Sequence, residues 1–233
     1  MRQPVFGFRA AIDPVLLAAA IPASEGEAIL EAGLGTGAAA LALLARVPGA
    51  RVVGIERDPE LAEIARDNAG LNGVAERLAV VCGDVADRAT SRAAAVLGPF
   101  RHAMANPPYF RGGAPSPDRL KQGAAQECAN APLALWIAVL ARRLLPRGTL
   151  TVILPPERLV EALAAFKTAG LGSTILFPFW PRAGAPARRV IVHGVKGGRG
   201  PLRLCAGLVL HEGEGFTAQA QAVLRDGAAL AFG

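Results

Sequence analysis

A chain of 233 residues, 52% of them hydrophobic, is long and apolar enough to bury its own core, which excludes an intrinsically disordered protein. No stretch reaches the roughly 18 uninterrupted apolar residues of a membrane helix, and the N-terminus lacks the apolar core of a signal peptide, so we expect a cytoplasmic protein without a membrane partner. The net charge of +6 favours an anionic partner.

The cysteines and histidines exclude two further classes. The three cysteines are odd in number and far apart, which leaves neither a disulfide framework nor a CxxC motif: Cys82, Cys128 and Cys205. The three histidines lack metal-ligand spacing beside an acid or a cysteine: His102, His193 and His211. We therefore predict no metal, and we expect Cys82 to be a small buried strand residue.

The first elements in chain order are a helix and a glycine-rich turn. Residues 13–20 predict a helix that is capped by Asp13 and covers a ligand site. An apolar strand over 28–30 leads into Glu31-Ala-Gly-Leu-Gly-Thr-Gly37, and a helix follows over 38–44. The three glycines allow tight turning and close approach of a ligand, while the helix start offers its unpaired N–H groups.

The next two strands each end on an acid. The strand over 51–56 ends at Glu56, whose carboxylate can accept hydrogen bonds from ribose hydroxyls, and a helix capped by Asp58 then covers 59–71. The strand over 78–82 is followed by Gly83-Asp84. Because the carboxyl ends of parallel strands meet at one edge of a sheet, these three strand ends point toward one adenosine-sized ligand.

A fourth strand, over 100–105, delivers Asn106-Pro107-Pro108-Tyr109 to the same edge. The Asn106 amide oxygen and the Pro107 carbonyl are acceptors, and Pro108 has no N–H, so the turn suits a substrate that donates hydrogen bonds. A planar amino group, as on adenine or a carboxamide, has two N–H bonds to give. Tyr109 supplies a ring on which such a flat group can stack.

Helix-like and strand-like runs continue to alternate beyond this turn. Helices are predicted over 131–145 and 156–169, and strands over 148–154 and 172–179. Such alternation predicts an α/β fold with a doubly wound, mostly parallel sheet. We expect an antiparallel C-terminal strand and one domain over 1–233.

Charge is divided unevenly along the chain. Residues 1–100 carry nine basic and twelve acidic side chains, and residues 101–233 carry sixteen and seven, so the two parts have net charges of −3 and +9. The excess of arginine begins at the Asn106–Tyr109 turn, which we call the acceptor turn because it offers hydrogen-bond acceptors. This is the pattern expected for contact with an RNA phosphate backbone. The candidate contacts are Arg111, Arg119, Lys121, Arg182, Arg188 and Arg189.

The glycine pattern alone does not choose the small-molecule ligand. Gly33-x-Gly35-x-x-Ala38 also satisfies a relaxed dinucleotide fingerprint, with Glu56 at about the spacing of roughly 20 residues that NAD binding requires. This motif alone therefore does not exclude an NAD-dependent oxidoreductase, although such an enzyme has no evident use for the Asn-Pro-Pro-Tyr turn.

Taken together, the motifs resemble those of S-adenosylmethionine-dependent amino-group methyltransferases, a class I family with a Rossmann-like fold. The resemblance implies S-adenosylmethionine as the cofactor and assigns seven contacts to it besides Asn106: Glu31, Gly33, Gly35 and Gly37 at the methionine end, Glu56 at the ribose, and Asp84 and Val85 at the adenine. It assigns the target amine to Asn106, Pro107, Pro108 and Tyr109. The chain then divides into a cofactor-covering helix segment (1–25), a catalytic core (26–195) and a C-terminal extension (196–233).

Three further segments are similar to bacterial tRNA adenine-N6 methyltransferases, whose substrate is a valine tRNA. They are Phe6-Gly-Phe-Arg-Ala-Ala-Ile-Asp13-Pro-Val-Leu-Leu17, residues 110–113 and Pro186-Ala-Arg-Arg-Val190. One departure is Ile12-Asp13-Pro14, where that family often has Thr-Asp-Gly, so any hydroxyl contact there is lost. The resemblance implies methyl transfer to N6 of adenine in tRNA.

Other methyltransferases with this turn are alternatives. Protein glutamine methyltransferases share it because a carboxamide presents the same two donors, but they usually carry a helical domain, for which there is no room before residue 28. Ribosomal RNA guanine-N2 enzymes and DNA adenine enzymes are further alternatives, the latter often with a separate base-recognition domain. An RNA-binding module on a methyltransferase fold is the non-enzyme alternative.

Overall fold

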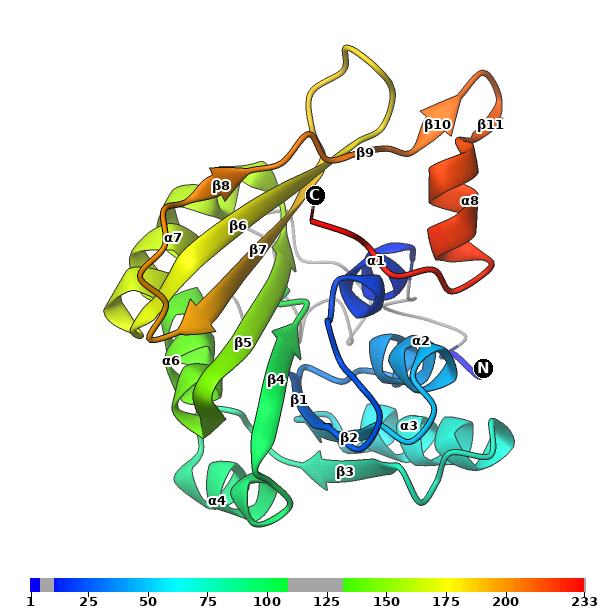
Figure 1. Cartoon of the computed structure of the whole chain (residues 1–233). Helices are drawn as coiled ribbons and strands as arrows, with labels where there is room; N and C mark the ends of the chain where they lie inside the picture. Colours follow the sequence, from blue (N-terminus) through cyan, green and yellow to red (C-terminus); the bar gives the residue numbers. More distant parts are fainter. Residues whose placement is uncertain (5–10, 109–131, 233) are drawn as a thin grey trace, which may run out of the picture.

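One mixed sheet organises the protein, in a computed structural model that describes residues 1–4, 11–108 and 132–232. Its strands lie in the order β3-β2-β1-β4-β5-β7-β6-β8, and β9 pairs with β6 (Figure 1). The strands of this sheet are β1 (Ala28–Ala32), β2 (Arg51–Glu56), β3 (Leu78–Cys82), β4 (Phe100–Ala105), β5 (Leu144–Leu154), β6 (Leu171–Trp180), β7 (Arg189–Lys196), β8 (Arg203–Leu204) and β9 (Leu208–Val209). A separate hairpin joins β10 (His211–Glu212) to β11 (Gly215–Phe216).

Helices cover both faces of the sheet (Figure 1). On one face lie α1 (Asp13–Ala19), α2 (Ala38–Arg46), α3 (Pro59–Leu71) and α8 (Ala218–Leu224). On the other lie α4 (Arg88–Val96), α6 (Leu133–Arg143) and α7 (Leu159–Thr168), which follows the short 3-10 helix η1 (Pro156–Arg158). Because both faces are covered, the central parallel strands are apolar almost throughout, as in β1, where all five residues are buried.

The strand directions confirm the sheet predicted from the sequence. Strands β3, β2, β1, β4 and β5 are mutually parallel, whereas β7 runs antiparallel to both β5 and β6. This is a doubly wound α/β sheet with an antiparallel C-terminal strand. Within the part of the chain that the structure describes, no helix is long and apolar enough to cross a membrane.

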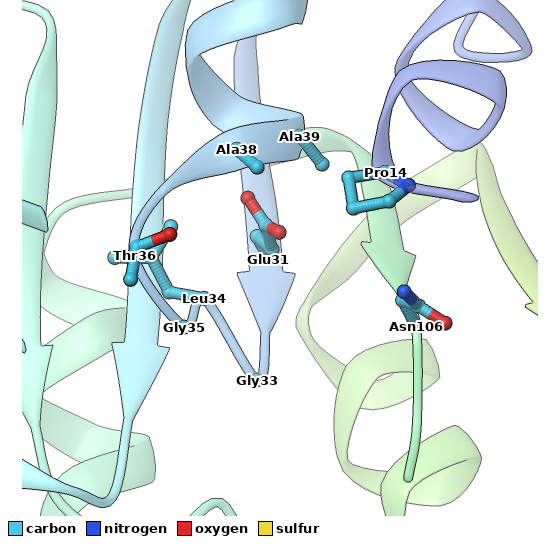
Figure 2. Close-up of a pocket in the computed structure, with 9 residues that line it drawn as sticks. All are labelled: Pro14, Glu31, Gly33, Leu34, Gly35, Thr36, Ala38, Ala39 and Asn106. Carbon is cyan, nitrogen blue, oxygen red and sulfur yellow. The ribbon is translucent and has the colours of Figure 1, made fainter. Parts of the chain in front are cut away.

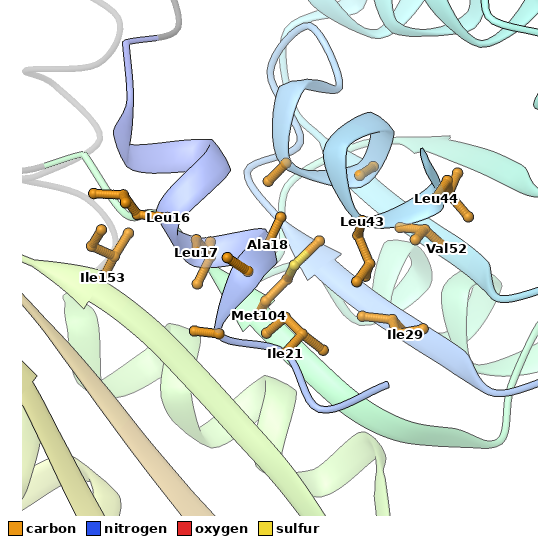
Figure 3. Packing of buried hydrophobic residues seen from close by; sticks show 14 of the residues in the cluster. Leu16, Leu17, Ala18, Ile21, Ile29, Leu43, Leu44, Val52, Met104 and Ile153 are labelled. Carbon is orange, nitrogen blue, oxygen red and sulfur yellow. The ribbon is translucent and has the colours of Figure 1, made fainter. Parts of the chain in front are cut away.

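Helix α1 lies against both the sheet and α2, near the carboxyl ends of the central strands. Leu16 and Leu17 share one apolar cluster with Leu43 of α2, Met104 of β4 and Ile153 of β5 (Figure 3). All five side chains are inaccessible to solvent. Burying a Leu or Ile side chain contributes about 1.5–3 kcal/mol, so this cluster fixes the N-terminal helix over the middle of the sheet.

Two local expectations are wrong, for physical reasons. Asp13 does not cap α1, since the helix begins after Ile12 without a side-chain cap, and the Asp13 carboxylate instead accepts a hydrogen bond from Arg189 Nε at 2.6 Å. Cys82 is exposed because it is the last residue of β3, the strand at the sheet edge. The sequence reasoning also missed α4, which is capped by Asp87 through the N–H of Thr90.

Candidate functional site

The carboxyl ends of β1 and β4 meet in the middle of the sheet. Strand β1 pairs with β2 on one side and with β4 on the other, so the chain winds outward in both directions from this point. Open α/β sheets bind ligands in the crevice at such a switch point. A pocket of about 50 Å³ lies there, and its lining residues are Pro14, Glu31, Gly33, Leu34, Gly35, Thr36, Ala38, Ala39 and Asn106 (Figure 2).

The glycine-rich turn forms one wall of this pocket. The N–H groups of Gly33 and Leu34 both donate to the Ile55 carbonyl, at 2.9 and 3.0 Å, which fastens the turn to the end of β2. Gly33 has a φ of +72°, and a Cβ there would lie 2.9 Å from the Trp136 ring of α6. Gly37, at φ +87°, precedes α2, whose first N–H groups have no side-chain cap, and Ala38 and Ala39 at the start of that helix line the pocket.

Glu31 is a buried acid on the floor of the pocket. Its side chain is 3% exposed and points toward the start of α2 (Figure 2). Burial raises the pKa of this carboxyl well above its usual range, and the nearby Glu56 charge raises it further, against the lowering effect of the Ala40 N–H. Its Oε2 atom has no hydrogen-bond partner among the described residues. A buried carboxyl with an unpaired oxygen is suited to a cationic group on a ligand.

Glu56 lies at the end of β2 and is tied to the backbone on both sides. Its Oε2 accepts from the Gly35 N–H at 2.6 Å, and its Oε1 accepts from the Asp58 N–H at 2.9 Å. Burial raises the pKa of Glu56, while these two N–H groups oppose that rise. Each carboxylate oxygen has a second lone pair, so Glu56 can hold the turn and still accept hydrogen bonds from a ligand.

Asp84 follows β3 and is more exposed than the other two acids, with 40% of its side chain accessible. Its Oδ1 accepts from the Ala86 N–H at 2.8 Å, and its Oδ2 lies 3.9 Å from Arg57 Nη1. Val85 beside it is buried. The predicted contact of Asp84 and Val85 with an adenine remains a prediction.

The acceptor turn begins directly after β4. Ala105, the last residue of β4, pairs with Ala32 of β1, so Asn106 lies beside the segment that carries Glu31 and Gly33. The Asn106 side chain lines the pocket (Figure 2). Pro107 is buried. The pocket thus brings together an acceptor amide, a buried acid and the glycine turn.

Several predicted residues lie outside the described part of the chain: Tyr109, Arg111, Arg119 and Lys121. Of the other candidate RNA contacts, Arg182 donates through Nη1 to the Gly213 carbonyl, and Arg188 lies next to Arg189 at the start of β7. Arg189 is ion-paired with Asp13, so part of its charge is already neutralised. The role of these arginines in RNA binding remains a prediction.

Three features near the pocket and the turn after β4 were not predicted from the sequence. Pro14, in the first turn of α1, lines the pocket, and the Asp13–Arg189 ion pair joins that turn to β7. Arg158 donates to the Pro108 carbonyl at 3.3 Å. No local signal predicts these contacts, because the partners lie 176 and 50 residues apart.

The polar groups of the site fit the chemistry of S-adenosylmethionine. The unpaired Oε2 of Glu31 suits the cationic methionine end, the glycine turn leaves room for close approach, and Glu56 has lone pairs that would accept from ribose hydroxyls. Over the described ranges, no group of three or more His, Cys, Asp or Glu side chains is arranged to hold a metal ion. The fold and the site together resemble those of Rossmann-like methyltransferases.

Comparisons with known proteins agree with this class. Residues 29–106 match the family described as "Methyltransferase domain". The tRNA1(Val) (adenine(37)-N6)-methyltransferase of Porphyromonas gingivalis is 38% identical over 134 residues, 57% of this chain and 51% of the relative. A release factor glutamine methyltransferase from Deinococcus radiodurans is 34% identical over 159 residues, 63% of this chain and 52% of the relative. The chain thus spans about half the length of these curated relatives.

The solved structures extend the similarity to nearly the whole chain. A predicted O-methyltransferase from Agrobacterium tumefaciens superposes with a TM-score of 0.77 at 29% identity, covering 94% of this chain and 98% of that one. The protein therefore has a methyltransferase fold, and the methyltransferase domain that it matches implies S-adenosylmethionine as the cofactor. Among methyltransferases it resembles the tRNA1(Val) adenine-N6 family, as the sequence motifs predict.

Proposed function

We propose that the protein transfers a methyl group from S-adenosylmethionine to an exocyclic amino group, and that the acceptor is N6 of adenine in tRNA. The observation that carries the proposal is the position of Asn106, whose amide lines the same pocket as Glu31 and the glycine turn. An acceptor for amine N–H bonds is thus placed beside the cofactor site. The tRNA1(Val) relatives support adenine in tRNA as the acceptor.

The chain's own residues would mainly align and polarise the amine. S-adenosylmethionine, when bound, supplies a methyl group that its sulfonium already activates. The Asn106 side chain and the Pro107 carbonyl would each accept one N–H of the amine, which draws its lone pair out of conjugation with the ring and stabilises positive charge developing on nitrogen. Alignment of the two reactants lowers the barrier by several kcal/mol.

The lining of the pocket favours an amine over a hydroxyl acceptor. Methyl transfer to a hydroxyl group needs a base to remove its proton, and the described residues that line the pocket include no His or Lys. The acid that lines the pocket, Glu31, is buried on the β1 side beneath the start of α2. A neutral amine attacks with its own lone pair and loses its proton afterwards, so acceptors such as Asn106 are sufficient.

A glutamine side chain in a protein is the second candidate acceptor. Release factor glutamine methyltransferases match this chain at identities similar to those of the tRNA enzymes, and a carboxamide offers the same two N–H donors to Asn106 and Pro107. The charge distribution favours RNA, because the part of the chain after residue 100 has a net charge of +9.

A labelled-methyl assay separates these candidates. Unmodified tRNA transcripts, release factor protein and duplex DNA would be offered together with radiolabelled S-adenosylmethionine, and the products digested to nucleosides or amino acids. We expect label in N6-methyladenosine from tRNA, and its loss in Asn106→Ala. Label in glutamine would show that the substrate is a protein and not tRNA. Label in none of the three substrates despite cofactor binding would contradict the proposed methyl transfer.

A further inference from the structure

Arg158 forms a contact that reaches the acceptor turn from a neighbouring strand. It is the last residue of η1, which follows β5, and β5 pairs with β4 along its length. Its Nη1 atom donates to the carbonyl of Pro108 at 3.3 Å. The Arg158 side chain is 13% exposed, so this contact is largely shielded from water. The guanidinium thus fastens the turn after β4 to the segment after β5.

Glu161, one turn further along in α7, holds this guanidinium in place. Its two carboxylate oxygens accept from Arg158 Nε and Nη2, both at 3.0 Å. A guanidinium is planar, so binding two of its nitrogens to one carboxylate fixes the position of the third nitrogen. Nη1 is thereby aimed at the Pro108 carbonyl at little further cost in side-chain entropy.

A turn made of two prolines needs such an external anchor. Each proline ring fixes φ, but ψ is still able to rotate and to change the direction of the carbonyl groups. Neither proline has an N–H with which to hold the turn by a backbone hydrogen bond. The bond from Arg158 restrains the Pro108 carbonyl and hence the path of the chain through Asn106 and Pro107.

We propose that Arg158, oriented by Glu161, is a positioning residue that keeps the Asn106 amide and the Pro107 carbonyl directed at the amine. The inference rests on the proposed function of the turn. Arg158 does not line the cofactor pocket, so its loss leaves cofactor binding intact and misaligns the acceptor amine. A misplacement of about 1 Å costs on the order of 100-fold in rate, and a loosened turn costs about 10- to 100-fold in kcat.

The chain contains a closely matched control arginine. Arg66 of α3 also pairs with a Glu three residues away, Glu63, and also donates to a backbone carbonyl, that of Val80 at 3.2 Å. It differs in being 40% exposed and in bonding to β3 rather than to the turn after β4. Arg66→Ala therefore removes a comparable ion pair and a comparable bond to a backbone carbonyl without touching the acceptor turn.

The test compares Arg158→Ala, Glu161→Gln and Arg66→Ala by methyl-transfer kinetics, and by calorimetric titration with S-adenosylmethionine. We expect kcat to fall about 10- to 100-fold in Arg158→Ala and less in Glu161→Gln, with cofactor Kd within about two-fold of the unmodified protein in all three. Arg158→Lys should restore only part of the rate, because an ammonium cannot form the fork and the carbonyl bond together. Equal kinetics for Arg158→Ala and Arg66→Ala would overturn the inference, as would a parallel loss of cofactor affinity in folded Arg158→Ala.

A second measurement does not depend on the proposed reaction. Hydrogen exchange of the Ala105 and Asn106 amides should accelerate in Arg158→Ala and not in Arg66→Ala. If the unmodified protein transfers methyl to no amine but these amides behave as expected, the proposed function fails while the positioning role of Arg158 stands. Unchanged exchange in Arg158→Ala refutes that role. If Arg158→Ala does not fold, Glu161→Gln carries the same comparison.

Discussion

The two sides of the pocket are built in different ways. The cofactor side consists of Glu31, the glycine turn and Glu56, which lie within 26 residues of sequence. The glycine turn is bonded to Glu56 through the Gly35 N–H and to the end of β2 through the Ile55 carbonyl. The acceptor side is the Asn106–Pro108 turn, which is braced from outside by Arg158. The first side is locally self-supporting and carries two buried carboxyl groups, those of Glu31 and Glu56. The second is neutral and depends on contacts from distant segments.

This difference separates binding from chemistry. A buried carboxyl that needs a cation should control the affinity for the cofactor, whereas neutral acceptors held in a fixed direction should control the rate of transfer. Substitutions on the two sides are therefore expected to change Kd and kcat separately, and variants that change both would break the comparison.

The largest effect is expected for Asn106→Ala. Removing the amide removes one acceptor for the reacting amine, and kcat should fall about 100- to 1,000-fold, the loss typical of a group that stabilises transition-state charge. Cofactor affinity, measured by calorimetry, should change by no more than about three-fold. Asn106→Asp serves as a control, since it keeps an acceptor oxygen of similar size. A large loss of cofactor affinity in Asn106→Ala would show that the two sides are not separable.

Glu31→Gln should have the next largest effect and should act on binding. The ligand cation would lose its ionic partner, which weakens cofactor affinity by about 1.5–3 kcal/mol, roughly 10- to 100-fold in Kd. Cofactor affinity of the unmodified protein should rise with pH through the raised pKa of Glu31, because only the ionised form pairs with a cation. Titrations at several pH values should show this rise, and it should be absent in Glu31→Gln.

The same substitution should stabilise the cofactor-free protein. Because the folded-state pKa of Glu31 is raised, its contribution to stability is fully present below the unfolded pKa, near 4.5, and is lost as pH rises through the folded pKa. Gln has no charge to bury, so the free energy of unfolding at neutral pH should increase. Denaturant unfolding with and without S-adenosylmethionine measures both effects. A Glu31→Gln variant that is less stable at neutral pH without cofactor would contradict this account.

Gly33→Ala should have a smaller effect, through strain in the turn. A Cβ at Gly33 would lie 2.9 Å from Trp136 in a backbone conformation with φ of +72°, which costs about 1–3 kcal/mol. Cofactor affinity should fall about ten-fold. Gly26→Ala is the matched control, because Gly26 has a similar φ of +80° but open space around the new Cβ. If both variants lose the same stability and affinity, contact with Trp136 has no part in shaping the site.

Asp13→Asn should have the smallest effect. It removes the charge that pairs with Arg189 while keeping an acceptor, so the first turn of α1 is held less firmly against the pocket. The pair is partly exposed, so we expect a loss of stability of about 0.5 kcal/mol and a two- to three-fold change in cofactor affinity. Arg203→Ala, on β8 at the sheet edge, serves as the comparison for a surface arginine. An unchanged cofactor affinity in Asp13→Asn would show that the Asp13–Arg189 pair does not contribute to cofactor binding.

That Glu31, the glycine turn and Glu56 lie at one edge of the sheet was predictable from the sequence, whereas their contacts with a cofactor remain predictions. Glu31, the glycines and Glu56 end strands whose apolar runs are clear, and parallel strands bring their carboxyl ends together. The bond from Glu56 to Gly35 was not predicted, since it depends on how far the turn folds back over β2. The Arg158 and Arg189 contacts were not predictable either, because each arginine is an ordinary charged residue until the sheet order sets β5 beside β4 and β7 beside β5.

The Asp13–Arg189 pair also bears on the order in which the protein matures during synthesis. Its members are 176 residues apart, so the wall that Pro14 gives the pocket cannot be fastened until most of the chain has left the ribosome. Glu31, the glycine turn and Glu56 emerge much earlier and close among themselves. In a nascent chain the part of the pocket with Glu31 and Glu56 therefore forms first, and the wall with Pro14 forms last. The pocket is complete only when β7 has joined the sheet.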